Sequence, residues 1–569
     1  MAKKKVHRLK LLAGMFMVLV LVAAACSSDG SEGATTSTAA SSETPTSSTE
    51  APETGTTAPA TTTTSPPAPT LEPIVISLST DINLIEPHLF RSTGAYAVTR
   101  ALYQPLLDQV YVDEGGARIG TTEVVPGPLL ESFDVAADGT ATFVLKPDAK
   151  FANGDPIKAA DAVYMLTRSI EAPASYIPLL LPFIAIDSSN SFQVVDDLTF
   201  TITPNEPTAL FDRFMTFQVF GPIQESLAAE KGTTDDPWAF DYFTTNANAS
   251  GPYLLKNWDQ AKGEVILDPN PGWPGEVANS GIVIRNVPDA AQRALLLQNG
   301  DIDVAAGLPP RLLDQLRTDA NVRVYSAPST GINYIGLNPD AEPNLANVQV
   351  RQAISYAIPY EALIDNVMFG LASPAGTLIT SNMETFDGAG AGVYTNDIEK
   401  AKELMAASGV APFEVELAVQ NSRSQDQQAA VFIQDALREI GITIKINVLP
   451  DGEFAGKRDA RELAMFFHEW FSWGDDPFYQ LTFLAKCGAF TNFVGACNER
   501  LDEVIAEGTF ETDPARRGAL GLEAQQLMVQ DANRIYLWAA DWSLATRANV
   551  TGVTKDFTQV PRFEFLSKS

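Results

Sequence analysis

Residues 129–164 hold a run of local signals that predicts two strands, two turns and a helix. They contain Leu129-Leu130-Glu131-Ser132-Phe133-Asp134-Val135, Asp138-Gly139, Thr142-Phe143-Val144-Leu145-Lys146, Asn153-Gly154-Asp155-Pro156 and Ala159-Ala160-Asp161-Ala162-Val163-Tyr164. The two apolar runs are joined by Asp138-Gly139, a dipeptide typical of hairpin turns. The second turn leads into a helix that begins near Ala159 and carries Asp161 in its first turn.

Elsewhere in the chain, segments of helical period alternate with short β-branched runs. The helical segments are 95–103, 397–408 and 427–439, and the strand-like runs are 74–78, 413–417 and 442–446. Because such alternation builds layered structures, we expect an α/β fold. No strand precedes the glycine-rich residues 388–392, so we expect a surface loop there.

The composition excludes several classes of protein. The 569 residues are 45% hydrophobic, which is too apolar for a wholly disordered chain. The 39 Lys and Arg against 70 Asp and Glu give a net charge of −31, which would repel nucleic acid. With three cysteines and three histidines, the chain cannot build a four-cysteine zinc module. We expect no nucleic-acid partner, no metal and no cofactor.

The N-terminus predicts export. Residues 1–25 hold five basic residues, no acid and an apolar run from Leu11 to Ala25, as in a secretory signal peptide. Val22 to Cys26 resembles a bacterial lipobox, in which the cysteine is acylated and becomes the mature N-terminus, although Ala23 stands where Leu, Val or Ile is usual. Ordinary cleavage beside a free cysteine is the alternative.

The segment after the signal is expected to be a tether. Residues 27–70 contain 23 Ser or Thr, six Pro, five acids and no base, so they cannot bury a core. As a flexible coil they would span about 35–40 Å. We therefore expect an acylated Cys26 and a disordered tether over 26–70, with the folded body beginning near Leu71.

The order of motifs in residues 129–164 resembles that of the family 5 extracytoplasmic solute-binding proteins, the receptors of peptide, nickel and related ABC importers. The resemblance continues along the chain through Gly251-Pro252-Tyr253, Asn270-Pro271-Gly272-Trp273, Gln298 to Asp303, Val350 to Ala357, Lys400 to Leu404 and Ile433 to Ile442. Asn347 and Pro359 replace aspartates that are usual around the Val350 helix. The resemblance covers about residues 71–569.

This resemblance implies a two-lobed, periplasmic-binding-protein-like (Venus-flytrap) α/β fold with an extra domain inserted in the first lobe. Transferred to this chain, it implies a first lobe from 71–108, 209–330 and 535–569, an inserted domain from 109–208 and a second lobe from 331–534. It also implies a binding protein and not an enzyme: a monomer, lipid-anchored on the extracytoplasmic face of the bacterial membrane, that captures a solute and delivers it to an ABC permease and ATPase complex. The ligand expected from the resemblance is an oligopeptide or a peptide-like compound.

The ligand site is sought in the segment Trp470-Phe471-Ser472-Trp473-Gly474-Asp475-Asp476-Pro477. In peptide-binding relatives, an aspartate in the corresponding segment pairs with the α-ammonium of the peptide, and that position is Trp473 here. Either Asp475 takes over this role, or the ligand has no α-ammonium and Trp473 offers it a stacking surface. An oligosaccharide or another amine-free solute is therefore the alternative ligand.

Weaker candidates for ligand contact are Trp470, Asn333, Tyr334, Tyr96 and Phe493. Core packing is the competing interpretation for the aromatic residues among them. Cys487 and Cys497 lie ten residues apart in an exported protein, so we expect a disulfide in preference to two free thiols.

A rival from another class is a secreted glycoside hydrolase. His468-Glu469 and Asp475-Asp476 could be drawn as its acid and base. Adjacent carboxylates on an extended chain point in different directions, however, so sequence neighbours rarely form a catalytic pair.

Overall fold

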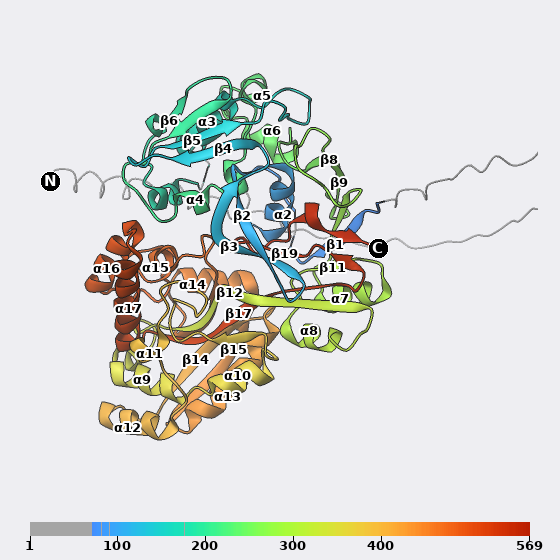
Figure 1. Cartoon of the computed structure of the whole chain (residues 1–569). Helices are drawn as coiled ribbons and strands as arrows, with labels where there is room; N and C mark the ends of the chain where they lie inside the picture. The colour runs from blue at the N-terminus through green and yellow to red at the C-terminus, as the bar shows by residue number, and fades with distance from the viewer. Residues whose placement is uncertain (1–70, 81, 90–91, 174, 176) are drawn as a thin grey trace, which may run out of the picture. The chain divides into compact units, whose positions relative to one another are not determined.

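The computed structural model describes residues 71–569 except 81, 90, 91, 174 and 176. The expected signal peptide, Cys26 and the tether therefore lie outside the described residues. The described chain is a two-lobed α/β structure, which confirms the predicted fold class (Figure 1). Within it, no helix is both long and apolar enough to span a membrane.

The main sheet has eleven strands among the described residues. In spatial order they are β15 (Ile442–Leu449), β14 (Phe413–Gln420), β16 (Met465–Trp470), β12 (Val322–Leu337), β17 (Arg534–Arg547), β11 (Val304–Ala305), β1 (Ile74–Leu78), β10 (Ile282–Asn286), β9 (Glu264–Pro269) and β8 (Tyr253–Asp259), with β13 (Ala372–Pro374) paired to β17. We call the part with β1 and β8–β11 the first lobe and the part with β14–β16 the second lobe.

Two long antiparallel strands, β12 and β17, connect the lobes (Figure 1). Near one end, β17 pairs with β11 of the first lobe, and near the other, β12 pairs with β16 of the second. Their register shifts between Ala327 and Gly331 and again between Asn333 and Tyr334. Such irregularities bend strands and re-aim side chains, and here they lie where the two lobes meet.

Two smaller sheets are formed by strands from residues 107–202, and one of them is joined by a strand from near the C-terminus. One contains β4 (Leu130–Val135), β5 (Ala141–Leu145), β7 (Thr199–Ile202) and β6 (Phe192–Val194), and the other contains β19 (Thr554–Lys555), β3 (Ala117–Pro126) and β2 (Leu107–Glu114). The predicted hairpin is confirmed by the antiparallel pair β4 and β5. The helix predicted after it is α3 (Ala159–Glu171), where Asp161 Oδ2 accepts a hydrogen bond from the Lys158 amide at 2.9 Å.

The remaining helices flank these sheets. Towards the first lobe they are α2 (Thr93–Leu102), α4 (Phe211–Phe214), α5 (Glu225–Lys231), α6 (Phe240–Thr245), α7 (Ala290–Asn299) and α8 (Pro310–Leu316). Towards the second they are α9 (Val348–Ala357), α10 (Tyr360–Asn366), α11 (Gly388–Ala391), α12 (Ile398–Ser408), α13 (Ser424–Arg438), α14 (Asp451–Asp459), α15 (Pro477–Leu484), α16 (Glu499–Phe510) and α17 (Pro514–Asp531).

The predicted alternation in the second lobe is confirmed by α12, β14, α13 and β15, and β14 and β15 pair in parallel. The expectation of a loop at residues 388–392 was wrong, because residues 388–391 form the short helix α11. Asp387 caps that helix by accepting a hydrogen bond from the Gly390 amide at 2.8 Å. A capping aspartate offsets the low helix propensity of glycine.

Candidate ligand-binding cavity

A cavity of about 700 Å³ lies between the lobes. From the first-lobe side it is lined by Ser92, Thr93 and Tyr96 at the start of α2 and by Thr558, Gln559 and Val560 near the C-terminus. From the second-lobe side it is lined by residues of β16, of α15 and of the loop between them. Strands β12 and β17 contribute Ser329, Gly331 and Asn333 and Ala540 and Asp541. A solute in this cavity would touch both lobes.

Aromatic rings form much of the cavity wall. Trp473 belongs to the loop after β16 of the second lobe and packs on rings of the first lobe, with its ring centroid 5.9 Å from that of Tyr96 and 6.1 Å from that of Phe217. Trp470 stacks on Phe483 at 5.5 Å. Indole and phenyl faces of this kind bind apolar groups, sugar rings and cations.

The loop that carries Trp473 is fixed by hydrogen bonds at both ends. The Ser472 amide donates to Thr330 Oγ1 at 3.0 Å, and the Asp476 amide donates to Ser472 Oγ at 3.1 Å. Asp476 also caps α15, since its Oδ1 accepts from the Tyr479 amide at 2.8 Å, and Pro477 follows at the first helical position. The position of Trp473 is therefore set by the strand β12 and the helix α15.

Asp475, the residue expected to take over amine binding, lies outside the cavity lining. Its backbone has a left-handed φ of 50°, and its Oδ1 is buried with no hydrogen bond to any described residue. Burial raises the pKa of its carboxyl group, and the charges of Lys555 and Arg213 oppose that rise. Asp475 is thus largely buried within the protein, close enough to Lys555 and Arg213 for their charges to act on it, and is not placed to meet a solute in the cavity.

Asn333 and Tyr334 lie on opposite faces of β12. Asn333 lines the cavity, whereas Tyr334 is fully buried in a hydrophobic cluster with Ile332 and Phe478. The ring of Tyr334 also lies 5.4 Å from the guanidinium carbon of Arg534. Successive side chains of a strand point to opposite faces, so only one of the two residues can reach the cavity.

Phe493 is placed away from the cavity as well. It is buried against His468, with ring centroids 5.0 Å apart, and beneath the guanidinium of Arg458 at 4.0 Å. Trp470, Trp473, Asn333 and Tyr96 thus line one cavity, while Tyr334, Phe493 and Asp475 do not.

Much of the lining was not predicted from the sequence, and α15 and Asp541 are two examples. Tyr479 and Phe483 lie four residues apart on α15, a spacing that places both on one helix face. This spacing is visible in the sequence and could have predicted that the two rings share one face of the helix. Asp541 lies near the middle of β17, about 70 residues from Trp473, and no local motif marks it.

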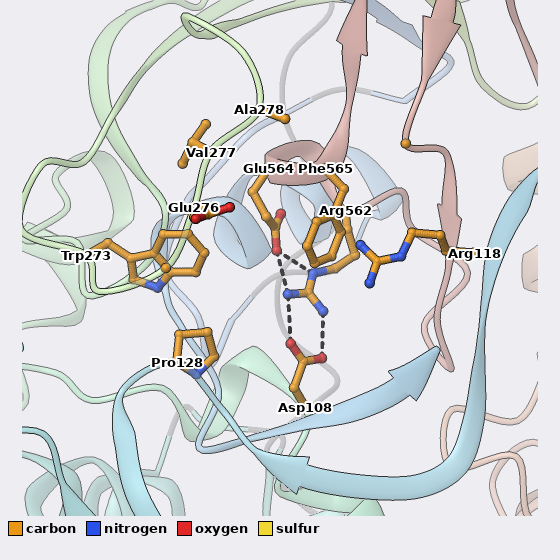
Figure 2. Close-up of a pocket in the computed structure, with 12 residues that line it drawn as sticks. Asp108, Arg118, Pro128, Trp273, Glu276, Val277, Ala278, Arg562, Glu564 and Phe565 are labelled. Atoms are coloured by element: carbon orange, nitrogen blue, oxygen red, sulfur yellow. Dashed lines mark hydrogen bonds and ion pairs between the residues drawn. The ribbon is translucent and has the colours of Figure 1, made fainter. Parts of the chain in front are cut away.

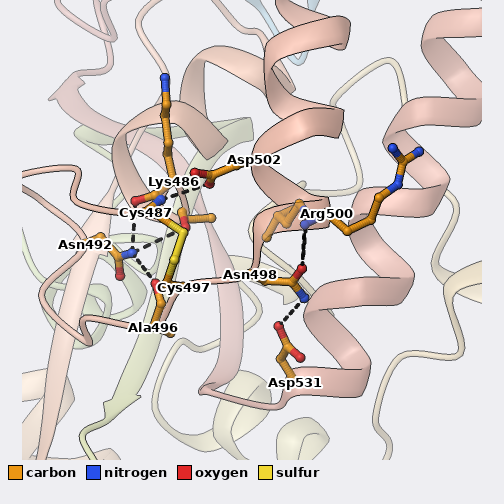
Figure 3. The surroundings of a disulfide bond; sticks show 11 residues. Lys486, Cys487, Asn492, Ala496, Cys497, Asn498, Arg500, Asp502 and Asp531 are labelled. Atoms are coloured by element: carbon orange, nitrogen blue, oxygen red, sulfur yellow. Dashed lines mark hydrogen bonds between the residues drawn. A yellow bond between two sulfur atoms is a disulfide. The ribbon is translucent and has the colours of Figure 1, made fainter. Parts of the chain in front are cut away.

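The structure joins Cys487 and Cys497 in a disulfide, with Cα atoms 4.7 Å apart (Figure 3). Inside the loop that it closes, the side-chain nitrogen of Asn492 donates to the carbonyls of Lys486 at 3.1 Å and Ala496 at 2.8 Å. The same loop carries Phe490, which lines the cavity although it is 59% exposed. The disulfide therefore supports one rim of the cavity.

Two of the residues considered for hydrolytic chemistry, Glu469 and Asp476, are held in ion pairs. Glu469 forms a two-pronged ion pair with Arg423, and Asp476 is fully buried and paired with Arg517. Burial and three nearby arginines lower the pKa of His468 to about 3, so the ring is neutral at physiological pH. Among the described residues, no group of three or more His, Cys, Asp or Glu side chains is placed to hold a metal ion.

A second cavity of about 370 Å³ lies beside the C-terminal segment (Figure 2). The buried Arg562 is one of its lining residues, and it pairs with Asp108 of β2 at 2.7 Å and with Glu564 at 2.5 Å. These contacts attach the C-terminal segment to the three-stranded sheet. Thr558, Gln559 and Val560 come shortly before Arg562 in the chain and line the larger cavity. The ion pairs of Arg562 therefore help to hold part of the wall of the larger cavity in place.

The model of the bacterial extracellular solute-binding proteins, family 5, middle region, matches residues 123–492. The probable D,D-dipeptide-binding periplasmic protein DdpA of Escherichia coli (strain K12) is 26% identical over 487 residues, which are 84% of this chain and 90% of that protein. The glutathione-binding protein GsiB of the same strain is 24% identical over 491 residues, 84% of this chain and 91% of that protein.

A solved structure, the ABC transporter-associated periplasmic binding protein DppA from Helicobacter pylori in complex with the peptide STSA, superposes with a TM-score of 0.71 at 22% identity. The superposition covers 87% of this chain and 98% of that one. At this identity the likeness shows a shared fold.

Proposed function

Because the chain belongs to the family 5 bacterial extracellular solute-binding proteins, we propose that it is the substrate-binding component of an ABC importer and that it captures a peptide-like solute in the cavity between its lobes. Members of this family bind solutes without transforming them, so the chain is not an enzyme and the glycoside hydrolase interpretation fails. The observation that carries the proposal is the cavity of about 700 Å³ with aromatic walls and lining residues from both lobes.

The mechanism follows from that arrangement. A solute that touches both lobes binds the closed form more tightly than the open one, and so shifts the population towards closure. A membrane permease that recognises the closed form would then receive loaded protein. The peptide class is supported by relatives named for dipeptide and glutathione binding and by the structural neighbour solved with a peptide.

The proposal includes a lipid anchor at Cys26, supported by the basic and apolar residues 1–25 and by the Ser/Thr/Pro-rich residues 27–70. Stable anchoring needs two or more acyl chains, as one chain binds membranes only marginally. A tether would keep the receptor near its permease and raise their effective concentration.

An amine-free solute, such as an oligosaccharide, is the second candidate ligand. It is favoured by Trp473, which presents an indole where peptide-binding relatives are expected to present a carboxylate, and by the placement of Asp475 outside the cavity.

The test is to purify the full chain from its host under native conditions and to identify the co-purified solute by mass spectrometry. We expect a peptide-like compound at near one equivalent. A sugar would support the second candidate. If no solute is recovered and none from a peptide or oligosaccharide panel binds in calorimetry, the proposed function is wrong.

A further inference from the structure

Asp541 is a carboxylate that faces the cavity from the strand connecting the lobes. It lies on β17, next to Ala540, and its backbone amide donates to the Leu371 carbonyl at 3.0 Å. It sits opposite the register shift between Ala327 and Gly331, where β12 departs from regular pairing. The backbone of Asp541 is thus held in place while its side chain borders the cavity.

The acidic residues in and beside the cavity differ in how their charge is compensated. Glu469 is paired with Arg423, and Asp475 lies outside the lining. No described residue forms an ion pair or a hydrogen bond with the carboxylate of Asp541. Lys555 and Arg317 act on it only as more distant charges. Of the described acidic residues that line the cavity, Asp541 is therefore the one available to a ligand.

The charges of the cavity lining favour a cationic ligand over an anionic one. Among the described residues that line the cavity, none is Lys, Arg or His, and two are acidic. A ligand carboxylate bound against this lining would find no described cationic partner there, whereas a ligand cation would meet Asp541 and the faces of aromatic rings. A partly buried carboxylate gains most from a cationic partner, and burial does raise the pKa of Asp541.

We propose that Asp541 is the contact for an ammonium or guanidinium group of the solute, whose apolar body packs on the aromatic wall formed by Trp470, Trp473 and Phe483. This inference rests on the proposed function and narrows its substrate class to solutes with a cationic group. Contact with the ammonium group is thereby assigned to strand β17 between the lobes, whereas the family resemblance placed it in the loop around Trp473.

The inference is tested with the full chain and two pools of tripeptide amides, one with free N-termini and one N-acetylated. The amides carry no C-terminal carboxylate, and the pools differ only in the α-ammonium. Calorimetry and native mass spectrometry would measure binding of each pool to wild type, Asp541→Asn and Glu114→Gln. Glu114 is an exposed carboxylate that also acts on Lys555 but lies outside the cavity lining, so Glu114→Gln controls for the loss of one negative charge.

We expect wild type and Glu114→Gln to prefer the free-amine pool by at least tenfold, and Asp541→Asn to lose that preference while its thermal unfolding temperature stays unchanged. Equal binding of both pools by wild type, or an undiminished preference in Asp541→Asn, would overturn the role of Asp541 and leave the importer function standing. Failure of wild type to bind either pool would instead count against a peptide-like ligand, and the inference would fall with it.

Discussion

The Arg213 guanidinium lies 3.3 Å from the Glu384 carboxylate and so links α4 to a segment of the second lobe. Glu384 Oε1 also accepts from Arg517 Nη1 at 2.7 Å, and Arg517 pairs with the buried Asp476. Asp476 ends the loop that carries Trp473 and caps α15. A continuous chain of ion pairs therefore runs from α4 to the edge of the cavity.

The first prediction is that Arg213→Met weakens solute binding by about three- to tenfold, because the closed form loses an ion pair between the lobes. The Arg213 side chain is 10% exposed and that of Glu384 is 44% exposed, so solvent screens the pair in part and the expected effect is modest. Calorimetry with the co-purified solute measures the change. Arg516→Met, which removes an exposed pair with Glu507, is the matched control and should bind as wild type. Equal affinities for both variants would contradict the role of the ion pair.

Trp473→Ala is predicted to weaken binding by about tenfold or more, or about 1.4 kcal/mol, because a ligand loses an aromatic face that comes from the second lobe and packs on rings of the first. The fold should persist, as Trp473 lies at the edge of the core and is only partly buried. Trp238→Ala, a partly exposed tryptophan outside the cavity, is the control. Wild-type affinity in Trp473→Ala would remove Trp473 from the site.

Short sequence motifs correctly predicted the turns and helix starts, because these features are formed by residues close together in the chain. The turn at Asp138-Gly139 and the first-turn Asp161 correctly marked β4, β5 and α3, because hairpin turns and helix starts depend on residues within four positions. At residues 388–391 a helix forms in place of the expected loop, because Asp387, one residue before the glycines, caps it through a local hydrogen bond to the Gly390 amide.

The cavity could be predicted only in part, since its wall comes from segments distant in the chain. Asn333 and Tyr334 were both candidates because sequence does not tell which face of a strand meets the cavity. Asp541 was missed because its place depends on β17 crossing between β11 and β12, a sheet order that no residue pattern around position 541 reveals. Asp475 was a candidate by adjacency alone, and its left-handed backbone could not be foreseen.

Removing the disulfide with Cys487→Ser and Cys497→Ser should lower the free energy of unfolding by about 2–3 kcal/mol, the value expected for a loop of ten residues. Urea denaturation of oxidised wild type and the double variant measures it. Asn492→Ala in the oxidised protein gives a comparison, since Asn492 holds the same loop through three described carbonyls. A double variant as stable as wild type would show that these hydrogen bonds suffice.

The last prediction concerns His468, whose ring packs 5.0 Å from Phe493 and 5.3 Å from Tyr334. Burial, together with Arg458, Arg534 and Arg423, lowers its pKa to about 3, against about 6.5 for an exposed histidine. Between these values the unfolded chain binds a proton that the folded chain does not. The contribution of His468 to stability is therefore fully present above pH 6.5 and is lost as the pH falls towards 3.

Measured by urea denaturation, the free energy of unfolding of wild type should fall by about 1–2 kcal/mol more than that of His468→Gln when the pH is lowered from 7 to 5. Other groups with shifted pKa values, such as His88 and Asp426, remain in both proteins, so to a first approximation their contributions cancel in the difference. The variant should be less stable than wild type at pH 7, because it loses the ring contacts, and the gap should narrow at pH 5. Parallel pH profiles for the two proteins would show that His468 is protonated equally in the folded and unfolded chains, and would contradict its burial among arginines.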